Sequence, residues 1–108
     1  MKEFKATVIK ALLPHIILLE TSKPMHGYEL IKLIRRKHGV NLGASTIYPA
    51  LNDLESQGLI TSQWIQPSPD NDRPRKVYTI TNKGKILLGQ TSIILNFVNK
   101  SLIEVKTA

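Results

Sequence analysis

The stretch Gly43-Ala-Ser-Thr-Ile-Tyr-Pro-Ala-Leu-Asn-Asp-Leu-Glu-Ser-Gln-Gly-Leu-Ile60 decides the fold of this chain. Its apolar side chains recur at spacings of three and four and therefore share one face of a helix: Ile47, Ala50, Leu51 and Leu54. The opposite face carries mostly small polar side chains: Ser45, Thr46, Tyr48, Pro49, Asn52 and Ser56. We expect Ser45 or Thr46 to cap the first turn and Gly58 to end the helix. A helix of this kind can enter the major groove of DNA.

Two helices are predicted before this stretch. The nearer one runs from Gly27 to His38 and ends at Gly39. Its apolar stripe consists of Leu30, Ile31 and Ile34. Its last turn is cationic and holds Arg35, Arg36, Lys37 and His38. These cations either stabilise the negative end of the helix dipole or bind phosphates as well. The first helix is expected over residues 3–20, where Pro14 either kinks it or begins a second piece.

Two short strands are predicted after the third helix. They cover Ile60 to Gln66 and Lys76 to Ile80, which are rich in β-branched and aromatic residues. The segment between them, Pro67-Ser-Pro-Asp-Asn-Asp-Arg-Pro74, has the composition of a loop. Two strands joined by a long, partly basic tip form a β-wing. Three helices followed by such a wing are the order of a winged helix-turn-helix, an α+β fold that is mostly α.

The last helix is predicted to begin at Asn82, with Thr81 as its cap, and to run to about Val105. About 24 residues at a rise of about 1.5 Å make it about 36 Å long. A helix of this length carries more apolar surface than a small domain can cover. We therefore expect it to pack against a second copy of the chain through these residues: Leu88, Ile94, Leu95, Val98, Leu102 and Val105. The predicted organisation is a winged helix-turn-helix domain over residues 1–80 and a dimerisation helix over residues 81–108.

The charge of the chain is high and unevenly distributed. The 108 residues have a net charge of +7, which favours a polyanionic partner, either nucleic acid or an anionic membrane surface. Residues 1–40 contain eight Lys or Arg and three acids, whereas residues 41–72 contain no Lys or Arg. This division suits a protein whose flanking segments bind phosphates while its third helix contacts bases.

Several other classes of protein are disfavoured. His15, His26 and His38 lack the spacing of metal ligands, and there is no cysteine. There is no glycine-rich phosphate loop, and Ser45 does not lie in a nucleophile elbow. We therefore expect no enzymatic activity, cofactor or metal. No uninterrupted apolar run approaches the roughly 20 residues of a membrane span, and no export signal stands out. A cytoplasmic, nucleoid-associated protein without a membrane partner is expected.

A series of motifs, collinear from about residue 12 to residue 88, resembles the signatures of the PadR family of transcriptional regulators. The motifs are His26-Gly-Tyr-Glu-Leu30, Ser45-Thr-Ile-Tyr-Pro-Ala-Leu51, Leu54-Glu, Gly58-Leu-Ile60, Ser62-Gln-Trp64, Arg73-Pro-Arg-Lys-Val-Tyr78 and Thr81-Asn-Lys-Gly84. The resemblance implies a dimeric winged-helix repressor of a pseudo-palindromic operator, with the third helix in the major groove of double-stranded DNA. The chain departs from the family in its long, proline-rich wing tip, its short C-terminal segment and the absence of Trp from its last helix.

The resemblance also implies a set of DNA-contacting residues. They are Lys32, Arg35 and Arg36 of the second helix, Ser45, Thr46, Tyr48 and Asn52 of the third, and Arg73, Arg75 and Lys76 of the wing. Competing roles stay open for some of them. Tyr48 can instead be a half-buried ring on the second helix, and Arg75 and Lys76 can be a solvated strand edge. Tyr28, Trp64 and Tyr78 are expected to be core and strand-pair residues.

Two further functions stay open beside DNA-binding repression. The first is a ligand-responsive regulator that binds a small aromatic or drug-like effector in the dimer interface, for which Phe97 is the candidate contact in the last helix. The second is a winged-helix module that binds protein and does not contact DNA directly. The acids of the third helix, Asp53 and Glu55, keep the second alternative open.

Overall fold

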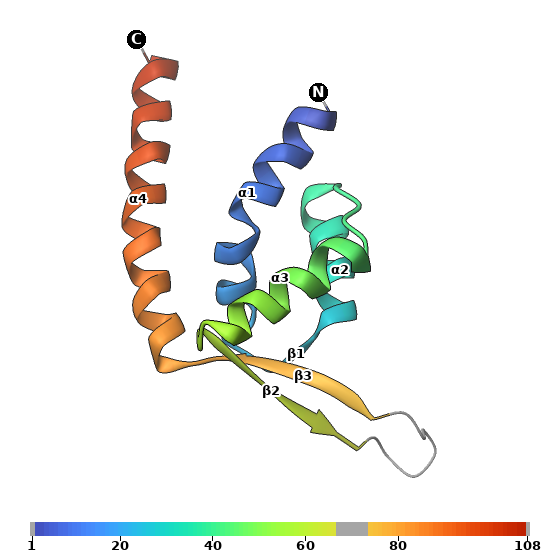
Figure 1. The fold of residues 1–108 in the computed structure, drawn as a ribbon. Helices are drawn as coiled ribbons and strands as arrows, with labels where there is room; N and C mark the ends of the chain where they lie inside the picture. The colour runs from blue at the N-terminus through green and yellow to red at the C-terminus, as the bar shows by residue number, and fades with distance from the viewer. Residues whose placement is uncertain (1, 67–73, 108) are drawn as a thin grey trace.

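The computed structural model describes residues 2–66 and 74–107, and in this part of the chain the helices lie on one side of a small sheet whose two longer strands extend away from them (Figure 1). The elements are, in order, α1 (Lys2–Glu20), β1 (Met25–His26), α2 (Gly27–His38), α3 (Ala44–Ser56), β2 (Ile60–Ile65), β3 (Arg75–Ile80) and α4 (Asn82–Thr107). This order confirms the predicted winged helix-turn-helix with a long C-terminal helix. The two wing strands differ from their predicted bounds by one residue each.

The sheet contains one strand that the sequence pattern does not reveal. All three strands are antiparallel, and β3 lies between β1 and β2. The strand β1 pairs Met25 with Tyr78 and His26 with Val77. A two-residue strand is too short to show an alternating pattern, so the sequence predicts no strand here. Its pairing ties the start of α2 to the base of the wing.

The core forms where α1, α2, α3 and the inner ends of the strands meet. The side chains of Ile17, Leu30, Ile34, Ile47 and Leu51 have no exposed surface. The predicted stripes of α2 and α3 therefore face this core, as their spacing requires. The helix α1 continues through Pro14 as one element and does not begin again there.

Three helix ends follow from particular residues. Gly39 and Gly58 have positive φ angles of 66° and 75°, which favour glycine, and they end α2 and α3 as predicted. The Oγ1 of Thr81 accepts a hydrogen bond of 3.1 Å from the backbone N–H of Gly84, which confirms the predicted cap of α4. The predicted cap of α3 is wrong. The helix begins at Ala44, before both predicted caps, so Gly43 takes the capping position without a side-chain bond and Ser45 lies within the first turn.

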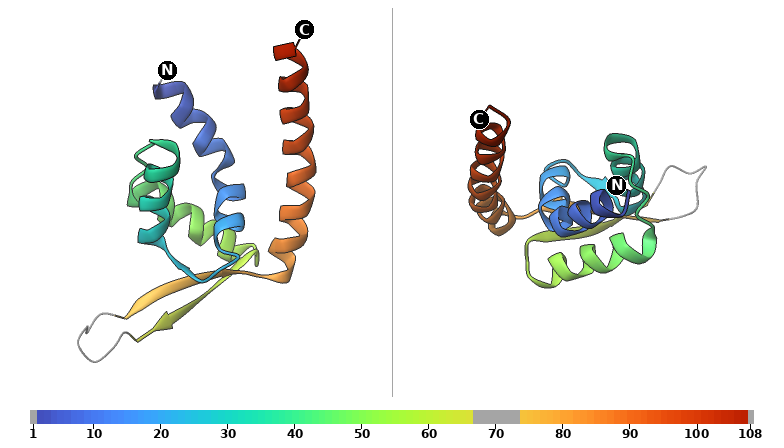
Figure 2. Two further views of the ribbon diagram at one scale, coloured as in Figure 1. Left: turned by 180° about the vertical axis from the view of Figure 1, so that it is seen from behind. Right: turned by 90° about the horizontal axis from the view of Figure 1, so that it is seen from above.

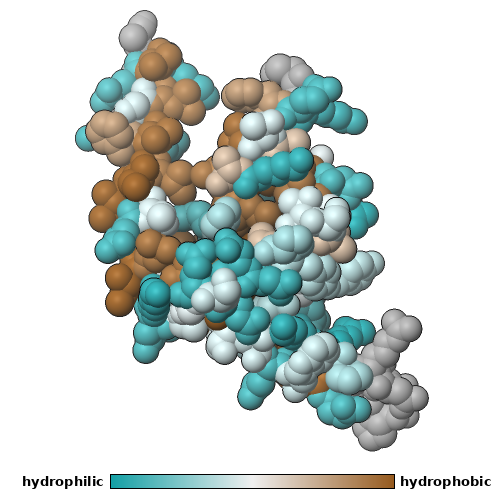
Figure 3. Space-filling model, in the orientation of Figure 1, coloured by the Kyte–Doolittle hydropathy of each residue, from teal (hydrophilic) through white to brown (hydrophobic). Residues whose placement is uncertain are grey.

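The helix α4 stands beside α1 and away from α2 and α3 (Figures 1 and 2). The Nδ1 of His15 and the Oγ1 of Thr91 lie 2.8 Å apart and join the two helices. Beyond this contact apolar side chains extend along the exposed length of α4 (Figure 3). By length and composition alone α4 is also apolar enough to cross a membrane, although its polar residues interrupt the apolar sequence. Such a surface needs a partner, either protein or lipid.

Candidate nucleic-acid interface

The helix α3 presents its polar face to solvent. Ser45, Tyr48, Asn52 and Ser56 are exposed and Thr46 is half-buried, while the opposite stripe lies in the core. The exposed face carries hydroxyl and amide groups and no Lys or Arg. Groups of this kind can donate to and accept from base edges and phosphates. The structure thus places the predicted α3 contacts together on one accessible surface.

Tyr48 is also packed against the neighbouring helix. A Cβ atom added to Gly27, the first residue of α2, would lie 2.6 Å from Cε1 of the Tyr48 ring. The ring therefore rests directly on the backbone of α2, and only glycine leaves room for it. It remains 38% exposed. Tyr48 thus packs on α2, as in the alternative weighed against a DNA contact, and it keeps enough exposed surface to contact DNA as well.

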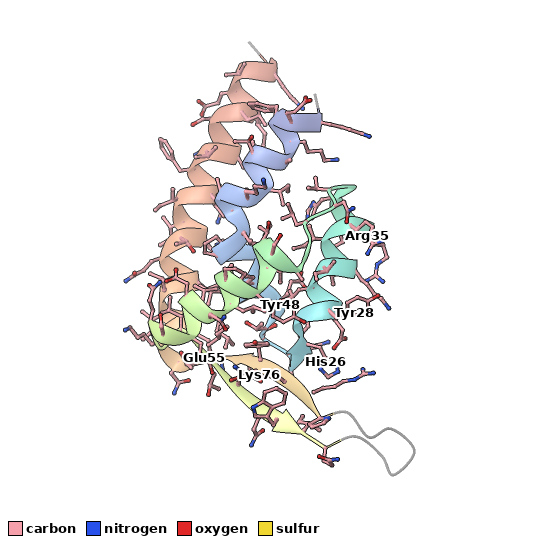
Figure 4. The ribbon with its side chains drawn as sticks, turned by 45° about the vertical axis from the view of Figure 1, so that its right-hand side comes forward. His26, Tyr28, Arg35, Tyr48, Glu55 and Lys76 are labelled. Atoms are coloured by element: carbon pink, nitrogen blue, oxygen red, sulfur yellow. The ribbon has the colours of Figure 1, made fainter. Side chains whose placement is uncertain are left out.

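The cations of α2 divide into two groups. Lys32, Arg35 and Arg36 are exposed, and the Nζ of Lys32 lies 4.7 Å from the centre of the Tyr28 ring. Lys37 instead forms an ion pair of 3.0 Å with Glu20 at the end of α1. Figure 4 shows Tyr28 near the start of α2, on the side of Tyr48, and Arg35 further along the helix. Three of the predicted phosphate contacts are therefore accessible.

The cations of the wing differ in whether they contact other side chains of the protein. Arg75, the first residue of β3, is exposed, and Arg73 lies outside the described residues. The Nζ of Lys76 lies 3.5 Å from Oε1 of Glu55 on α3, and it also lies over the rings of Tyr78 and Trp64, 5.6 and 6.0 Å from their centres. Lys76 is thus engaged with the protein itself (Figure 4).

Glu55 links α3 to the wing through two strands. Besides its ion pair with Lys76 of β3, its carboxylate accepts a hydrogen bond from the Ser62 hydroxyl of β2. Glu55 therefore joins α3 to both strands of the wing. Both partners of the ion pair are about one third exposed, so the pair itself stabilises the fold by at most about 1 kcal/mol.

A groove of about 960 Å³ lies between the starts of α2 and α3 and the wing. It is lined by His26, Gly27, Tyr28, Glu29, Lys32, Tyr48, Asn52, Trp64, Pro74, Arg75, Lys76 and Tyr78. We call it the wing groove. It brings together predicted contacts from all three elements, namely Lys32, Tyr48, Asn52, Arg75 and Lys76.

Tyr28, Trp64 and Tyr78 were expected to be core and strand-pair residues, and the structure gives a different outcome for each of them. Tyr28 is 58% exposed and Trp64 is 67% exposed, whereas Tyr78 is buried as expected. The expectation is wrong for Tyr28, which lies exposed on α2. Trp64 is confirmed as a strand-pair residue opposite Lys76 but does not lie in the core, and the strand register explains why. Ile60, Ser62 and Trp64 share one face of β2, and this face covers the core at Ile60 but extends past it at Trp64. The predicted strand β2 is long enough to extend past the core that α3 covers, and this length could have indicated that Trp64 is exposed.

Burial raises the pKa of the Tyr78 phenol above its ordinary value of 10.0, and the negative charge of Glu55 and the nearby Tyr48 phenol raise it further. Tyr78 is therefore a neutral hydrogen-bonding group throughout the physiological range. It forms the inner end of the wing groove, beneath the ammonium group of Lys76.

The predicted dimerisation residues lie on α4 in two different settings. Ile94, Phe97, Val98, Leu102 and Val105 are exposed. Leu88 is half-buried against the core of its own chain, and Leu95 is half-buried as well. Sequence spacing missed three other exposed apolar residues of α4, which are Ile86, Ile93 and Ile103. Phe97, the candidate ligand contact, is 72% exposed, and its role stays a prediction.

The described residues include no cluster of three or more His, Cys, Asp or Glu side chains that could hold a metal ion. His26 takes the capping position of α2, where its backbone N–H donates to Oε1 of Glu29 at 3.0 Å.

Comparisons with known proteins agree with this arrangement. A sequence profile described as the transcriptional regulator PadR-like family matches residues 16–90. The transcriptional regulator Rv3488 of Mycobacterium tuberculosis is 33% identical to this chain over 88 residues, which are 82% of this chain and 76% of that protein. These matches cover α2, α3 and the whole of the wing.

Solved structures show the same architecture. A PadR family transcriptional regulator from Eggerthella lenta superposes with a TM-score of 0.77 at 28% identity, covering 92% of this chain and 85% of that chain. A PadR-like transcriptional regulator from Bacillus cereus superposes with a TM-score of 0.83 at 24% identity, covering 94% and 98% of the two chains. The second likeness shows the fold alone, and it extends through the long C-terminal helix.

Proposed function

The chain belongs to the PadR-like family of transcriptional regulators, and from this premise we propose that it is a homodimeric repressor that binds a pseudo-palindromic site on double-stranded DNA. Members of this family are regulators and not enzymes. As such a repressor, it acts in the cytoplasm, at the nucleoid. Its α3 helix lies in the major groove, and the wing contacts the adjacent backbone.

The exposed polar face of α3 is the observation that carries this proposal. The face is free of Lys and Arg, while Lys32, Arg35 and Arg36 of α2 lie on an adjacent surface and Arg75 lies on the wing. Phosphate contacts supply most of the affinity of such a protein, and base contacts supply its specificity. The separation of charged from neutral hydrogen-bonding groups therefore matches the two tasks.

The exposed apolar face of α4 supports the dimer. Phe97 and Val105 are 72% and 74% exposed, and side chains of this size rarely remain in water along a whole helix. Phe4 and Val8 at the start of the neighbouring helix α1 are exposed apolar side chains as well. We propose that a second copy covers both helices. Two-fold symmetry then presents two α3 helices to one side of a duplex.

Paired substitutions on α2 and α3 test the DNA-binding proposal. Arg36→Ala removes a phosphate contact, so it should weaken binding to all duplexes by a similar factor and reduce the salt dependence of the affinity. Asn52→Ala removes a base-edge group, so it should change the preference between sequences by a factor of about 5 to 100. Fluorescence anisotropy with labelled duplexes at several salt concentrations measures both effects.

Lys10→Ala on the exposed face of α1 is the matched control, because it changes the net charge by the same amount away from α3. It should leave the sequence preference unchanged. If Arg36→Ala and Asn52→Ala bind every duplex as Lys10→Ala does, the assignment of α2 and α3 to DNA is wrong. If the unaltered protein binds no duplex even at low salt, the protein-interaction alternative replaces the proposal.

A further inference from the structure

The wing groove has aromatic walls that come from three separate elements. Tyr28 of α2, Tyr48 of α3 and Trp64 of β2 all line it, and all three rings retain exposed surface. Exposed rings that converge on one groove are unusual in a folded chain and are typical of a binding surface. Trp64 has no role in the core, because two thirds of its surface is exposed.

The indole of Trp64 is held in place by its neighbours. Trp64 is paired with Lys76 across the two wing strands, and the Lys76 ammonium lies 6.0 Å from the centre of its ring. Lys76 is in turn fixed by the Glu55 carboxylate at 3.5 Å. The contacts join α3, β3 and β2 in sequence, so the ring is positioned relative to the exposed face of α3. Lys76 therefore acts as a positioning residue more than as a phosphate ligand.

The charge of the wing groove selects an anionic occupant. Three cations line it, and since Lys76 is paired with Glu55, the two that remain for an occupant are Lys32 and Arg75, against the carboxylate of Glu29. The Glu29 carboxylate is already engaged by His26, whose backbone N–H and Nε2 lie 3.0 and 3.4 Å from it. An acidic peptide would satisfy the cations but would not require three aromatic walls. A sugar–phosphate strand alternates anionic phosphates with apolar sugar faces and so fits both features.

We infer that the wing groove holds one sugar–phosphate strand of the bound duplex, with the indole of Trp64 packed on a deoxyribose and the phenols of Tyr28 and Tyr48 donating hydrogen bonds to phosphates. The strand is the one that passes between α3 in the major groove and the wing beside it. This inference rests on the proposed DNA-binding function and adds a contact that the sequence did not predict, because Trp64 was expected to be a core or strand-pair residue.

Trp64 is the only tryptophan of the chain, so its own fluorescence reports on the wing groove. The unaltered protein is titrated with two duplexes, one recovered by selection from random DNA and one of mixed sequence. Binding is followed by the anisotropy of a label on the DNA, and the indole is followed by acrylamide quenching. We expect the quenching constant to fall at least about twofold as the labelled DNA becomes bound, because a ring that is two thirds exposed becomes covered.

Substitutions give a second measurement. Trp64→Ala should weaken DNA binding about tenfold, which corresponds to about 1.4 kcal/mol, because it removes the apolar surface that packs on the sugar. Ile65→Ala is the matched control, because Ile65 is an exposed apolar residue of the same strand on its other face. It should bind as the parent does, and thermal melting should show that both variants remain folded.

The outcomes separate this inference from the proposed function. Bound DNA with an unchanged quenching constant, or Trp64→Ala binding as Ile65→Ala does, would overturn the wing-groove assignment and leave the DNA-binding function standing. No binding of either duplex would overturn both. Glu55→Gln tests the positioning role, because it should loosen the indole and raise its quenching constant in the free protein while leaving the salt dependence of binding unchanged.

Discussion

Phe97→Ala is the substitution that most sharply tests the dimer. Phe97 lies in the second half of α4 and is 72% exposed. The change therefore removes little that holds the single chain together, and the chain's own free energy of unfolding should change by no more than about 0.5 kcal/mol. In a dimer that covers α4, the same change removes one buried ring from each subunit.

The exposed area of the ring sets the expected magnitude. A phenylalanine buries about 150 to 250 Å² when it is covered. The 72% that is exposed here therefore corresponds to roughly 110 to 180 Å², or about 3 to 4.5 kcal/mol at about 25 cal/mol per Å². Alanine recovers part of this, which leaves a loss of about 2 to 3 kcal/mol for each copy. Two copies in a symmetric dimer lose about 4 to 6 kcal/mol, and the dimer Kd should rise by about 10³ to 10⁴.

Sedimentation equilibrium over a wide range of protein concentration measures this Kd directly. Ile65→Ala serves as the control, because it removes an exposed apolar side chain of the wing that lies outside the proposed interface. Its dimer Kd should equal that of the parent. The reasoning is refuted if Phe97→Ala dimerises within threefold of the parent, or if the parent itself sediments as a single chain at every concentration.

Three further predictions concern the fold around the site. Gly27→Ala should push the Tyr48 ring off α2, because the new Cβ would lie 2.6 Å from it. DNA affinity measured by anisotropy should then fall about tenfold, while the melting temperature changes little. An unchanged affinity would show that the position of the Tyr48 ring is irrelevant to binding. Gly84→Ala should destabilise the chain by about 2 to 4 kcal/mol in urea unfolding, because its Cβ would lie 2.1 Å from a backbone carbonyl oxygen. The control Gly89→Ala has open space around it and should be neutral or stabilising by up to about 1 kcal/mol. Equal effects of the two changes would contradict the tight contact at Gly84. The raised pKa of Tyr78 means that the native state disfavours its phenolate, so stability should be level below the unfolded-state pKa of 10.0 and fall as the pH rises from there through the folded-state pKa; Tyr78→Phe should remove part of this alkaline loss in urea titrations, and an identical pH profile would count against the assignment.

Much of the fold was predictable because particular residues determine where elements end. Gly39 and Gly58 take the left-handed conformation that ends a helix, and Thr81 caps α4 with its hydroxyl, so these boundaries follow from local chemistry. The stripe of α3 was predictable for the same kind of reason, because a spacing of three and four leaves only one face for Ile47 and Leu51.

The remaining features depend on contacts between segments distant in sequence. Nothing near Lys76 in the sequence indicates that Glu55, on another element, holds its ammonium group. Likewise, the exposure of Trp64 depends on how far the wing extends past the core, which only the packed structure defines. Patterns along the chain therefore predicted which residues share a face, but they could not predict which cations are already engaged within the protein.

Selection of bound sites from a random pool of duplex DNA tests the central claim most directly, because it examines binding, symmetry and spacing in one measurement. Two α3 helices related by a two-fold axis predict an inverted repeat whose half-sites lie about one helical turn apart, or a multiple of that distance. Enrichment of such a repeat would support the account. A single asymmetric site, or a recovered pool no different from the starting pool, would contradict it.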